Sequence, residues 1–201
     1  MVRWRGFYAI VDPAVCEPLE TTDAILAGGC GVLQLRDKRG DDRATLRLAR
    51  ELSRRCRAAG RPFVMNDRLD LALLAGADGL HLGQDDLPIE DARRLFGGPI
   101  GLSTHSLDQA REAARRGADL LGFGPIFATA TKEDAEPPVG LEGLAEVCRA
   151  VDIPVVAIGG LRVVDASPVL AAGAAMGAAI GAVCGAEDPL RAARAFHEAW
   201  S

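Results

Sequence analysis

Aromatic side chains are scarce in this sequence of 201 residues, where they make up 4% of the total. A core assembled around large rings is therefore not expected. Hydrophobic residues nevertheless account for 49% of the chain, so the core must consist mainly of Leu, Val, Ile and Ala. Aliphatic strands of this kind are typical of a parallel sheet that helices cover on both faces.

Closely spaced cysteine pairs and long apolar runs are absent. The odd number of well-separated cysteines argues against a disulfide framework and favours the reducing cytoplasm, where we expect this protein. The chain does not begin with the hydrophobic segment of a secretory signal. Its least charged tract, residues 169–185, is rich in Ala and Gly, so we expect no membrane span. The five cysteines are Cys16, Cys30, Cys56, Cys148 and Cys184.

An excess of positive charge is also missing, since the net charge is −5. Bulk electrostatics therefore give no reason to expect nucleic acid or an anionic membrane as a partner. The arginines between residues 42 and 59 are interleaved with Glu51 and have no aromatic partners, which favours a solvated helix face. Small molecules are the expected partners, and the sequence leaves a homo-oligomer open.

Apolar segments that suit strands alternate with helical patterns along the whole chain. This alternation predicts parallel strands with right-handed crossovers, and eight units predict closure into a barrel. We expect residues 1–201 to form one (β/α)8 TIM-barrel domain with its active site at the C-terminal ends of the strands. An open doubly wound sheet would start with a glycine-rich loop, where this chain has Val11-Asp12-Pro13. The expected strands lie near 7–11, 32–36, 62–66, 79–82, 99–103, 119–123, 154–158 and 177–181, and the expected helices near 20–28, 42–59, 69–75, 88–96, 106–116, 141–151, 163–172 and 188–199.

Polar residues that could bind ligands or take part in a reaction stand at the ends of the expected strands. Asn66, Asp67 and Asp86 follow two neighbouring strands, and two carboxylates there suit Mg²⁺, which also takes water and phosphate oxygens. The alternative for Asp67 and Asp86 is simple capping of a helix and a turn. Gln34, Arg36 and Lys38 alternate, so they point to one side of their strand, into the mouth of a barrel.

The two cations on this strand need an anionic partner. A diphosphate that bridges Mg²⁺, Arg36 and Lys38 fits the charge balance, and a structural ion-pair network across the mouth is the alternative. Ser103 ends a further expected strand and is followed by His105, for which we expect no role as a general base. His81, inside a strand, is expected to be a packing histidine with its hydrogen bonds satisfied.

Two further segments suit phosphate binding. The connection 124–139 is long for a loop between strand and helix, and it carries Thr129, Thr131 and Lys132, which could donate to phosphate oxygens. Gly159-Gly160 and Ile180-Gly181 are expected to end the seventh and eighth strands, after which barrels commonly bind phosphate through backbone N–H groups.

In this order, the motifs resemble those of thiamine phosphate synthase, from Phe7 to Phe196. The family joins a hydroxymethylpyrimidine diphosphate to a thiazole phosphate, or to its carboxylated form, and releases pyrophosphate. The resemblance implies a dissociative reaction, in which diphosphate leaves before the thiazole nitrogen attacks. The most specific stretches are 34–38, 66–68, 81–86, 101–105, 122–127 and 157–160.

The resemblance assigns the site residues in three groups. Asp67 and Asp86 would bind Mg²⁺ as the cofactor. The pyrimidine diphosphate would be held by Gln34, Arg36, Lys38, Asn66, Ser103 and Lys132, of which Arg36, Lys38, Ser103 and Lys132 would be catalytic. The thiazole phosphate would be held by Thr129, Thr131, Gly160, Ile180 and Gly181.

The sequence departs from the family pattern around the eighth strand. Gly181 stands where the family often has serine, and Ala174-Ala175-Met176-Gly177 replaces the usual Gly-Ala-Asp-Gly. Two other functions remain open. One is a related thiazole tautomerase, which would use a histidine near His105 and need no diphosphate site. The other is a catalytically silent protein that binds thiamine phosphate.

Overall fold

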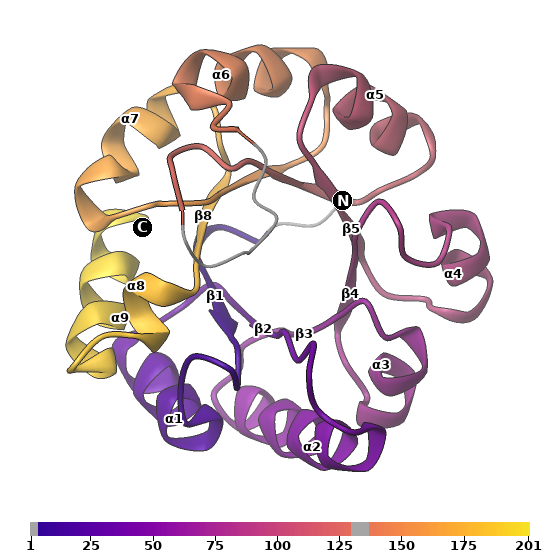
Figure 1. The fold of residues 1–201 in the computed structure, drawn as a ribbon, viewed down its shortest axis with the longest axis vertical. Coiled ribbons are helices and arrows are strands. Elements are labelled where there is room, and N and C mark those ends of the chain that lie inside the picture. Colours follow the sequence, from indigo (N-terminus) through magenta and orange to yellow (C-terminus); the bar gives the residue numbers. More distant parts are fainter. Residues whose placement is uncertain (1–3, 130–136) are drawn as a thin grey trace.

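Eight parallel strands close into a barrel in the order of the chain, as the alternating pattern predicted (Figure 1). The computed structural model describes residues 4–129 and 137–201. Every strand pairs with its sequence neighbours, and the last pairs with the first. The strands are β1 (Gly6–Val11), β2 (Val32–Leu35), β3 (Phe63–Asn66), β4 (Gly79–Leu82), β5 (Ile100–Thr104), β6 (Leu120–Phe123), β7 (Val155–Ile158) and β8 (Met176–Ala179).

The helices form a ring outside the barrel, and most of them fill the crossover between two consecutive strands (Figure 1). The prediction missed a four-residue helix between β8 and the last helix. The helices are α1 (Pro18–Gly28), α2 (Asp42–Ala58), α3 (Leu69–Ala75), α4 (Ile89–Leu95), α5 (Leu107–Arg115), α6 (Gly140–Ala150), the 3₁₀ helix η1 (Val163–Asp165), α7 (Ala166–Ala171), α8 (Gly181–Cys184) and α9 (Pro189–Ala199).

Two apolar cores stabilise this arrangement. The larger lies between the barrel and the helices, where Phe7 of β1 stacks against Phe196 of α9 with ring centroids 5.1 Å apart. The smaller fills the barrel interior and includes Ile10, Val64 and Val156. Both consist mostly of aliphatic side chains, in agreement with the scarcity of aromatic residues. Because the interior is packed, a ligand can enter only above it, at the C-terminal ends of the strands.

The end of β8 differs from the expectation. Ile180-Gly181 was expected to end the strand, but β8 stops at Ala179 and Gly181 begins α8. The amides of Val183 and Cys184 donate to the carbonyl oxygen of Ile180, at 3.1 and 2.8 Å. These two bonds turn the chain into a helix immediately after the strand, so Ile180 and Gly181 belong to the loop and helix above the barrel.

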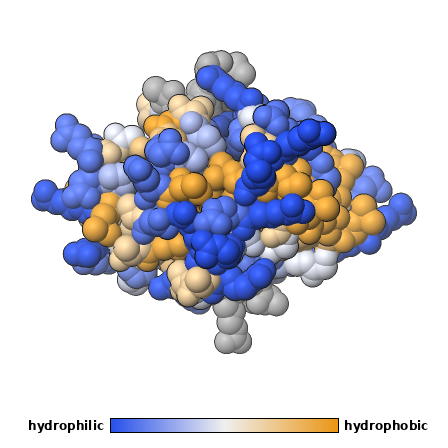
Figure 2. All heavy atoms as spheres, turned by 90° about the horizontal axis from the view of Figure 1, so that it is seen from below, coloured by the Kyte–Doolittle hydropathy of each residue, from blue (hydrophilic) through white to orange (hydrophobic). Residues whose placement is uncertain are grey.

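Several charged side chains on the outer surface form ion pairs. Arg54 and Arg55 of α2 both donate to Glu51, at 2.7 and 2.8 Å, which fits the expected solvated helix face. Figure 2 shows hydrophilic side chains projecting over much of one outer face, with apolar surface between them. Within residues 4–129 and 137–201, no helix has the length and apolar character needed to cross a membrane.

Candidate active site

The strand register brings the polar residues of β2 to β5 close together at the barrel mouth. Asn66 of β3 lies beside His81 of β4, and His81 lies beside Gly101 of β5. Gln34 of β2 lies deeper in the barrel than Asn66, because it is level with Ile10 of β1 and Val64 of β3. The predicted gathering of polar residues at the strand ends is therefore present in the fold.

Gln34 is buried inside the barrel, where its side-chain amide donates to the hydroxyl of Tyr8 at 2.9 Å. Burial raises the pKa of Tyr8 well above its usual range, so the phenol stays protonated at any physiological pH. The pair fixes the orientation of the Gln34 amide at the floor of the mouth. A neutral donor and acceptor held in this way can recognise a heteroaromatic ring.

The two cations that follow β2 form ion pairs with the ends of the neighbouring strands. Arg36 Nη1 lies 2.5 Å from Asp12 Oδ2, just beyond β1, and both side chains are largely buried. Lys38 pairs with Asp67, just beyond β3. The ion-pair network weighed as an alternative is thus present, and it holds both cations at the mouth.

Asp67 and Asp86 come close enough at the mouth for each carboxyl group to affect the ionisation of the other. Asp67 has a φ of 60°, a left-handed conformation that aspartate adopts more readily than most residues. Burial and the adjoining Asp86 raise the pKa of Asp67. Asp86 accepts the backbone N–H of Gly83 at 2.6 Å. Two carboxylates this close need a shared proton or a cation between them.

The mouth offers few protein ligands for a metal ion. Within the described part of the chain, no cluster of three or more His, Cys, Asp or Glu side chains could hold a metal. Asp67 and Asp86 offer two carboxylates, which matches Mg²⁺ bound by one or two protein ligands with waters and substrate phosphate oxygens. The residues therefore fit Mg²⁺ that a diphosphate helps to hold.

Ser103 at the end of β5 is held from two sides. Its hydroxyl lies 2.9 Å from His81 Nε2, and its carbonyl oxygen accepts the side-chain amide of Gln84 at 2.5 Å. A Cβ on Gly101 would lie 2.6 Å from His81 Nδ1, so glycine at this position makes room for the imidazole. His81 is satisfied, as expected, and it also faces the mouth and orients Ser103.

His105 is engaged by the backbone. Its Nδ1 lies 2.5 Å from the carbonyl oxygen of Gly124, beyond β6. Its own N–H donates to the side chain of Gln109 on α5 at 2.7 Å. The ring thus joins the ends of β5 and β6, a structural role that fits the prediction of no general base here.

Thr129, Gly160, Ile180 and Gly181, four of the residues predicted to bind the thiazole phosphate, follow β6, β7 and β8 in the other half of the mouth. Gly160 follows β7 with a φ of 66°, and a Cβ there would lie 2.5 Å from the carbonyl oxygen of Ala128. Thr129 comes directly after Ala128, so the loops after β6 and β7 touch at this point. Gly181 begins α8 after β8. Thr131 and Lys132 lie outside the described residues, and their positions stay predictions.

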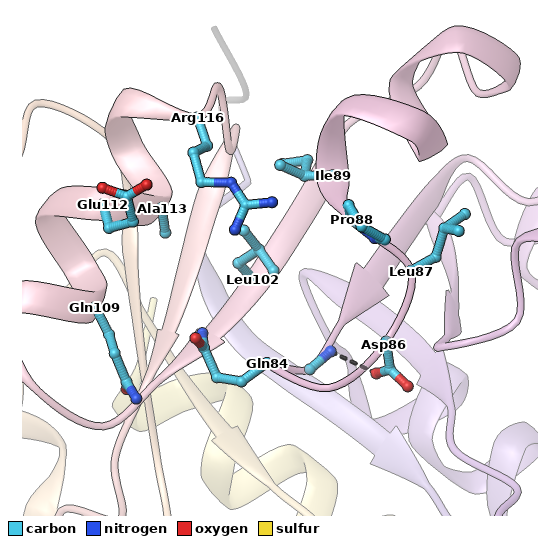
Figure 3. Close-up of a pocket in the computed structure, with 11 residues that line it drawn as sticks. Gln84, Asp86, Leu87, Pro88, Ile89, Leu102, Gln109, Glu112, Ala113 and Arg116 are labelled. Carbon is cyan, nitrogen blue, oxygen red and sulfur yellow. Dashed lines mark hydrogen bonds between the residues drawn. The ribbon is translucent and has the colours of Figure 1, made fainter.

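A cavity of about 150 Å³ adjoins the site on its outer side (Figure 3). It lies between the start of α4, the outer face of β5 and α5, and it shares Gln84 and Asp86 with the mouth. The cationic residues of the mouth do not line it, so the cavity is separate from the predicted diphosphate site. The other lining residues labelled in Figure 3 are Leu87, Pro88, Ile89, Leu102, Gln109, Glu112, Ala113 and Arg116.

Two residues of this site were not among the predicted ones. Tyr8 and Asp12 belong to β1 and its exit, and they contact Gln34 and Arg36. The sequence carried a signal for Asp12, because it ends an apolar strand just as Asp67 does. Tyr8 lies within an apolar run and offered none.

Comparisons with known proteins agree with this geometry. Residues 7–183 match the family described as thiamine monophosphate synthase. The thiamine-phosphate synthase of Chloroflexus aurantiacus is 44% identical over 198 residues, which cover 96% of this chain and 91% of that protein. The thiamine-phosphate synthase of Anaeromyxobacter dehalogenans is 47% identical over 201 residues, covering 98% and 89%.

Solved structures give the same result. The thiamine phosphate pyrophosphorylase from Pyrococcus furiosus has a TM-score of 0.91 and 36% identity, covering 98% of this chain and 96% of that one. A 3-hexulose-6-phosphate synthase at 18% identity, with a TM-score of 0.72, shares the fold alone. The chain therefore belongs to the thiamine monophosphate synthase family.

Proposed function

We propose that this chain is a Mg²⁺-dependent thiamine phosphate synthase that acts in the cytoplasm. Membership of the family makes it a transferase of thiamine biosynthesis. The proposed reaction joins hydroxymethylpyrimidine diphosphate to a thiazole phosphate and releases pyrophosphate; with the carboxylated thiazole phosphate, CO2 leaves as well. The observation that carries the proposal is the convergence of Asp67 and Asp86 beside Lys38, with Arg36 directly after the same strand, β2.

In this reaction the bond between the pyrimidine methylene carbon and the diphosphate oxygen breaks, and its electron pair leaves with pyrophosphate. Arg36 and Lys38, with Lys132 from the long loop, would stabilise the negative charge that grows on the leaving group. Asp67 and Asp86 would hold Mg²⁺, which would supply further stabilisation of this negative charge. Ser103 would donate a hydrogen bond to the diphosphate, with His81 fixing its hydroxyl.

The pyrimidine cation must then be captured. Gln34, fixed by Tyr8, and Asn66 would orient the ring, and the thiazole nitrogen attacks the methylene carbon to form the new C–N bond. This nitrogen carries no proton, so the step needs no general base. Thr129, Thr131, Gly160, Ile180 and Gly181 would hold the thiazole phosphate in the opposite half of the mouth.

The metal assignment is tested by thermal unfolding and by turnover with the variant Asp67→Asn. Mg²⁺ at a hundred times its dissociation constant stabilises a native protein by about 2.7 kcal/mol, which corresponds to roughly 5–10 °C at this size. Wild type is expected to show such a shift when titrated in the presence of pyrophosphate. Asp67→Asn should lose the shift and lower turnover by on the order of 10²-fold.

The matched control is Asp85→Asn, which removes the same charge from an exposed neighbour of Asp86. In chelator, where no metal is bound, Asp67→Asn should unfold at a temperature no lower than that of wild type. The reason is that the substitution removes one of two adjoining carboxylates, and asparagine tolerates the positive φ of this position. Full activity of wild type after verified removal of metal would refute the assignment. Binding of both substrates without release of pyrophosphate would indicate a silent binding protein instead.

A further inference from the structure

Arg68, the residue that follows Asp67, connects the loop after β3 to two helices. Its Nε and Nη2 donate to the two carboxylate oxygens of Asp70 in α3, at 2.9 and 2.7 Å. Its Nη1 donates to Asp42, the first residue of α2, at 2.6 Å. The two helices lie side by side outside the barrel (Figure 1). The guanidinium therefore holds the loop that carries Asp67 against the start of α2.

The loop that Arg68 holds contains a strained turn. The Arg68 N–H donates to the carbonyl oxygen of Asn66 at 2.7 Å and closes a three-residue turn around Asp67, whose φ is 60°. Such turns with a positive φ are rare, and strained backbone persists only where surrounding contacts hold it. The Asp67 N–H donates to the carbonyl oxygen of His81 at 2.7 Å, which fixes the turn on the side of β4. Arg68 supplies contacts on the opposite side, toward α2.

We propose that Arg68 is a positioning residue, which keeps the Asp67 carboxylate in place for Mg²⁺ by joining the loop after β3 to α2. This inference rests on the proposed function. Inside the mouth, the ion pair between Lys38 and Asp67 joins the loops after β2 and β3. In the proposed reaction this pair opens, because Lys38 turns to the diphosphate and Asp67 to Mg²⁺. The bond from Arg68 to Asp42 uses neither residue, so it holds the two loops together while the inner pair opens.

Solvent exposure sets the expected size of the effect. The Arg68 side chain is 39% exposed, and those of Asp42 and Asp70 are 73% and 58% exposed. Exposed ion pairs contribute little to global stability, although bidentate arginine–carboxylate pairs and networks hold their geometry better. Residues that orient a metal ligand typically change metal affinity by about 10–100-fold, and the exposure here places Arg68 at the lower end, about tenfold. Because salt screens exposed charges, the difference should shrink between about 0.05 and 0.5 M salt.

The first test titrates Mg²⁺ in the presence of pyrophosphate and follows thermal unfolding of the whole chain. Arg68→Ala should need about tenfold more Mg²⁺ than wild type for half of the shift, while its urea midpoint in chelator changes little. Arg68→Lys keeps the charge without the planar fork, so it should recover only part of the affinity. The control Arg47→Ala removes an exposed charge from the second turn of α2 and should behave as wild type. An equal Mg²⁺ requirement for Arg68→Ala and wild type would overturn the proposal, and so would a difference that salt does not reduce.

The second test breaks the same bond from its other end. Asp42→Asn should also raise the Mg²⁺ requirement, and adding it to Arg68→Ala should cost almost nothing more. In steady-state assays, saturating Mg²⁺ should restore kcat to both single variants and leave the KM for the thiazole phosphate unchanged. Fully additive effects would refute the role of the Arg68–Asp42 bond. A wild type without any Mg²⁺-dependent shift would refute the metal assignment of the proposed function, whereas a wild-type shift that Arg68→Ala fully shares would refute this inference alone.

Discussion

The ion pair between Asp12 and Arg36 allows a test of whether Asp12 positions Arg36, the cation proposed to bind the diphosphate. Asp12 Oδ2 contacts Arg36 Nη1, while Oδ1 accepts the backbone N–H of Ala14 at 2.9 Å. The variant Asp12→Asn keeps an acceptor for Ala14 and removes only the charge that faces the guanidinium. Arg36 would then lose its ionic partner and the orientation in which we propose that it meets the leaving diphosphate.

The size of the effect follows from the burial of the pair. The Asp12 side chain is 6% exposed and that of Arg36 is 19% exposed. Breaking a fully buried pair costs about 3–5 kcal/mol, whereas exposed pairs contribute about 0–1 kcal/mol. An intermediate value of about 2 kcal/mol corresponds to a roughly 30-fold loss in kcat/KM for the pyrimidine diphosphate. The KM for the thiazole phosphate should stay unchanged, because the bond to Ala14 still holds the loop.

The assay is the initial rate of pyrophosphate release, with Asp85→Asn as the control for loss of one exposed carboxylate at the same end of the barrel. A double-mutant cycle with Arg36→Ala separates positioning from a general loss of stability. If Asp12 acts through Arg36, adding Asp12→Asn to Arg36→Ala should cost almost nothing more. A 30-fold loss that persists in the Arg36→Ala background would refute the reasoning, and so would activity of Asp12→Asn within about twofold of wild type.

Two further variants test packing and the absence of a general base. Gly177→Ala would place a Cβ 2.2 Å from the Trp200 ring, so it should destabilise the fold by about 1–3 kcal/mol in urea unfolding. Gly97→Ala, where a Cβ meets nothing within 4 Å, is its control, and equal midpoints would contradict the prediction. His105→Asn should keep synthase activity within about threefold, because the His105 ring bonds the Gly124 carbonyl and has a structural role. If His105 were a general base, its loss would instead lower activity by roughly 10²–10⁴-fold. Near-complete loss with an unchanged circular dichroism spectrum would contradict this view.

The sequence predicted those features that depend on local pattern. The strand Phe63–Asn66 was expected at 62–66, because an apolar run bounded by polar residues has few other solutions in a doubly covered sheet. The polar residue that ends such a run lies at the mouth whatever the details of packing. Asn66, Asp67 and Ser103 could therefore be placed before any contact was known.

Partners across the barrel could not be predicted in this way. The bond from Gln34 to Tyr8 depends on the register in which Ile10 lies beside Gln34, and register is set by packing of the whole sheet. The pairing of Arg36 with Asp12, in preference to Asp67 or Asp86, depends on the same alignment of β1 with β2. Charge balance at the mouth was predictable, but the choice of carboxylate for each cation was not.

The error at β8 has a physical cause in the side chains. Residues 174–181 are mostly alanine and glycine, which give no contrast between an inner and an outer face, so the pattern did not fix where the strand begins. In the fold, Met176 enters the inner core and Gly177 faces Trp200, and this alternation sets the register. A helix as short as α8 has no periodicity to detect. Gly181 nevertheless follows the C-terminal end of β8, where barrels commonly bind phosphate, so the phosphate contact stays a prediction.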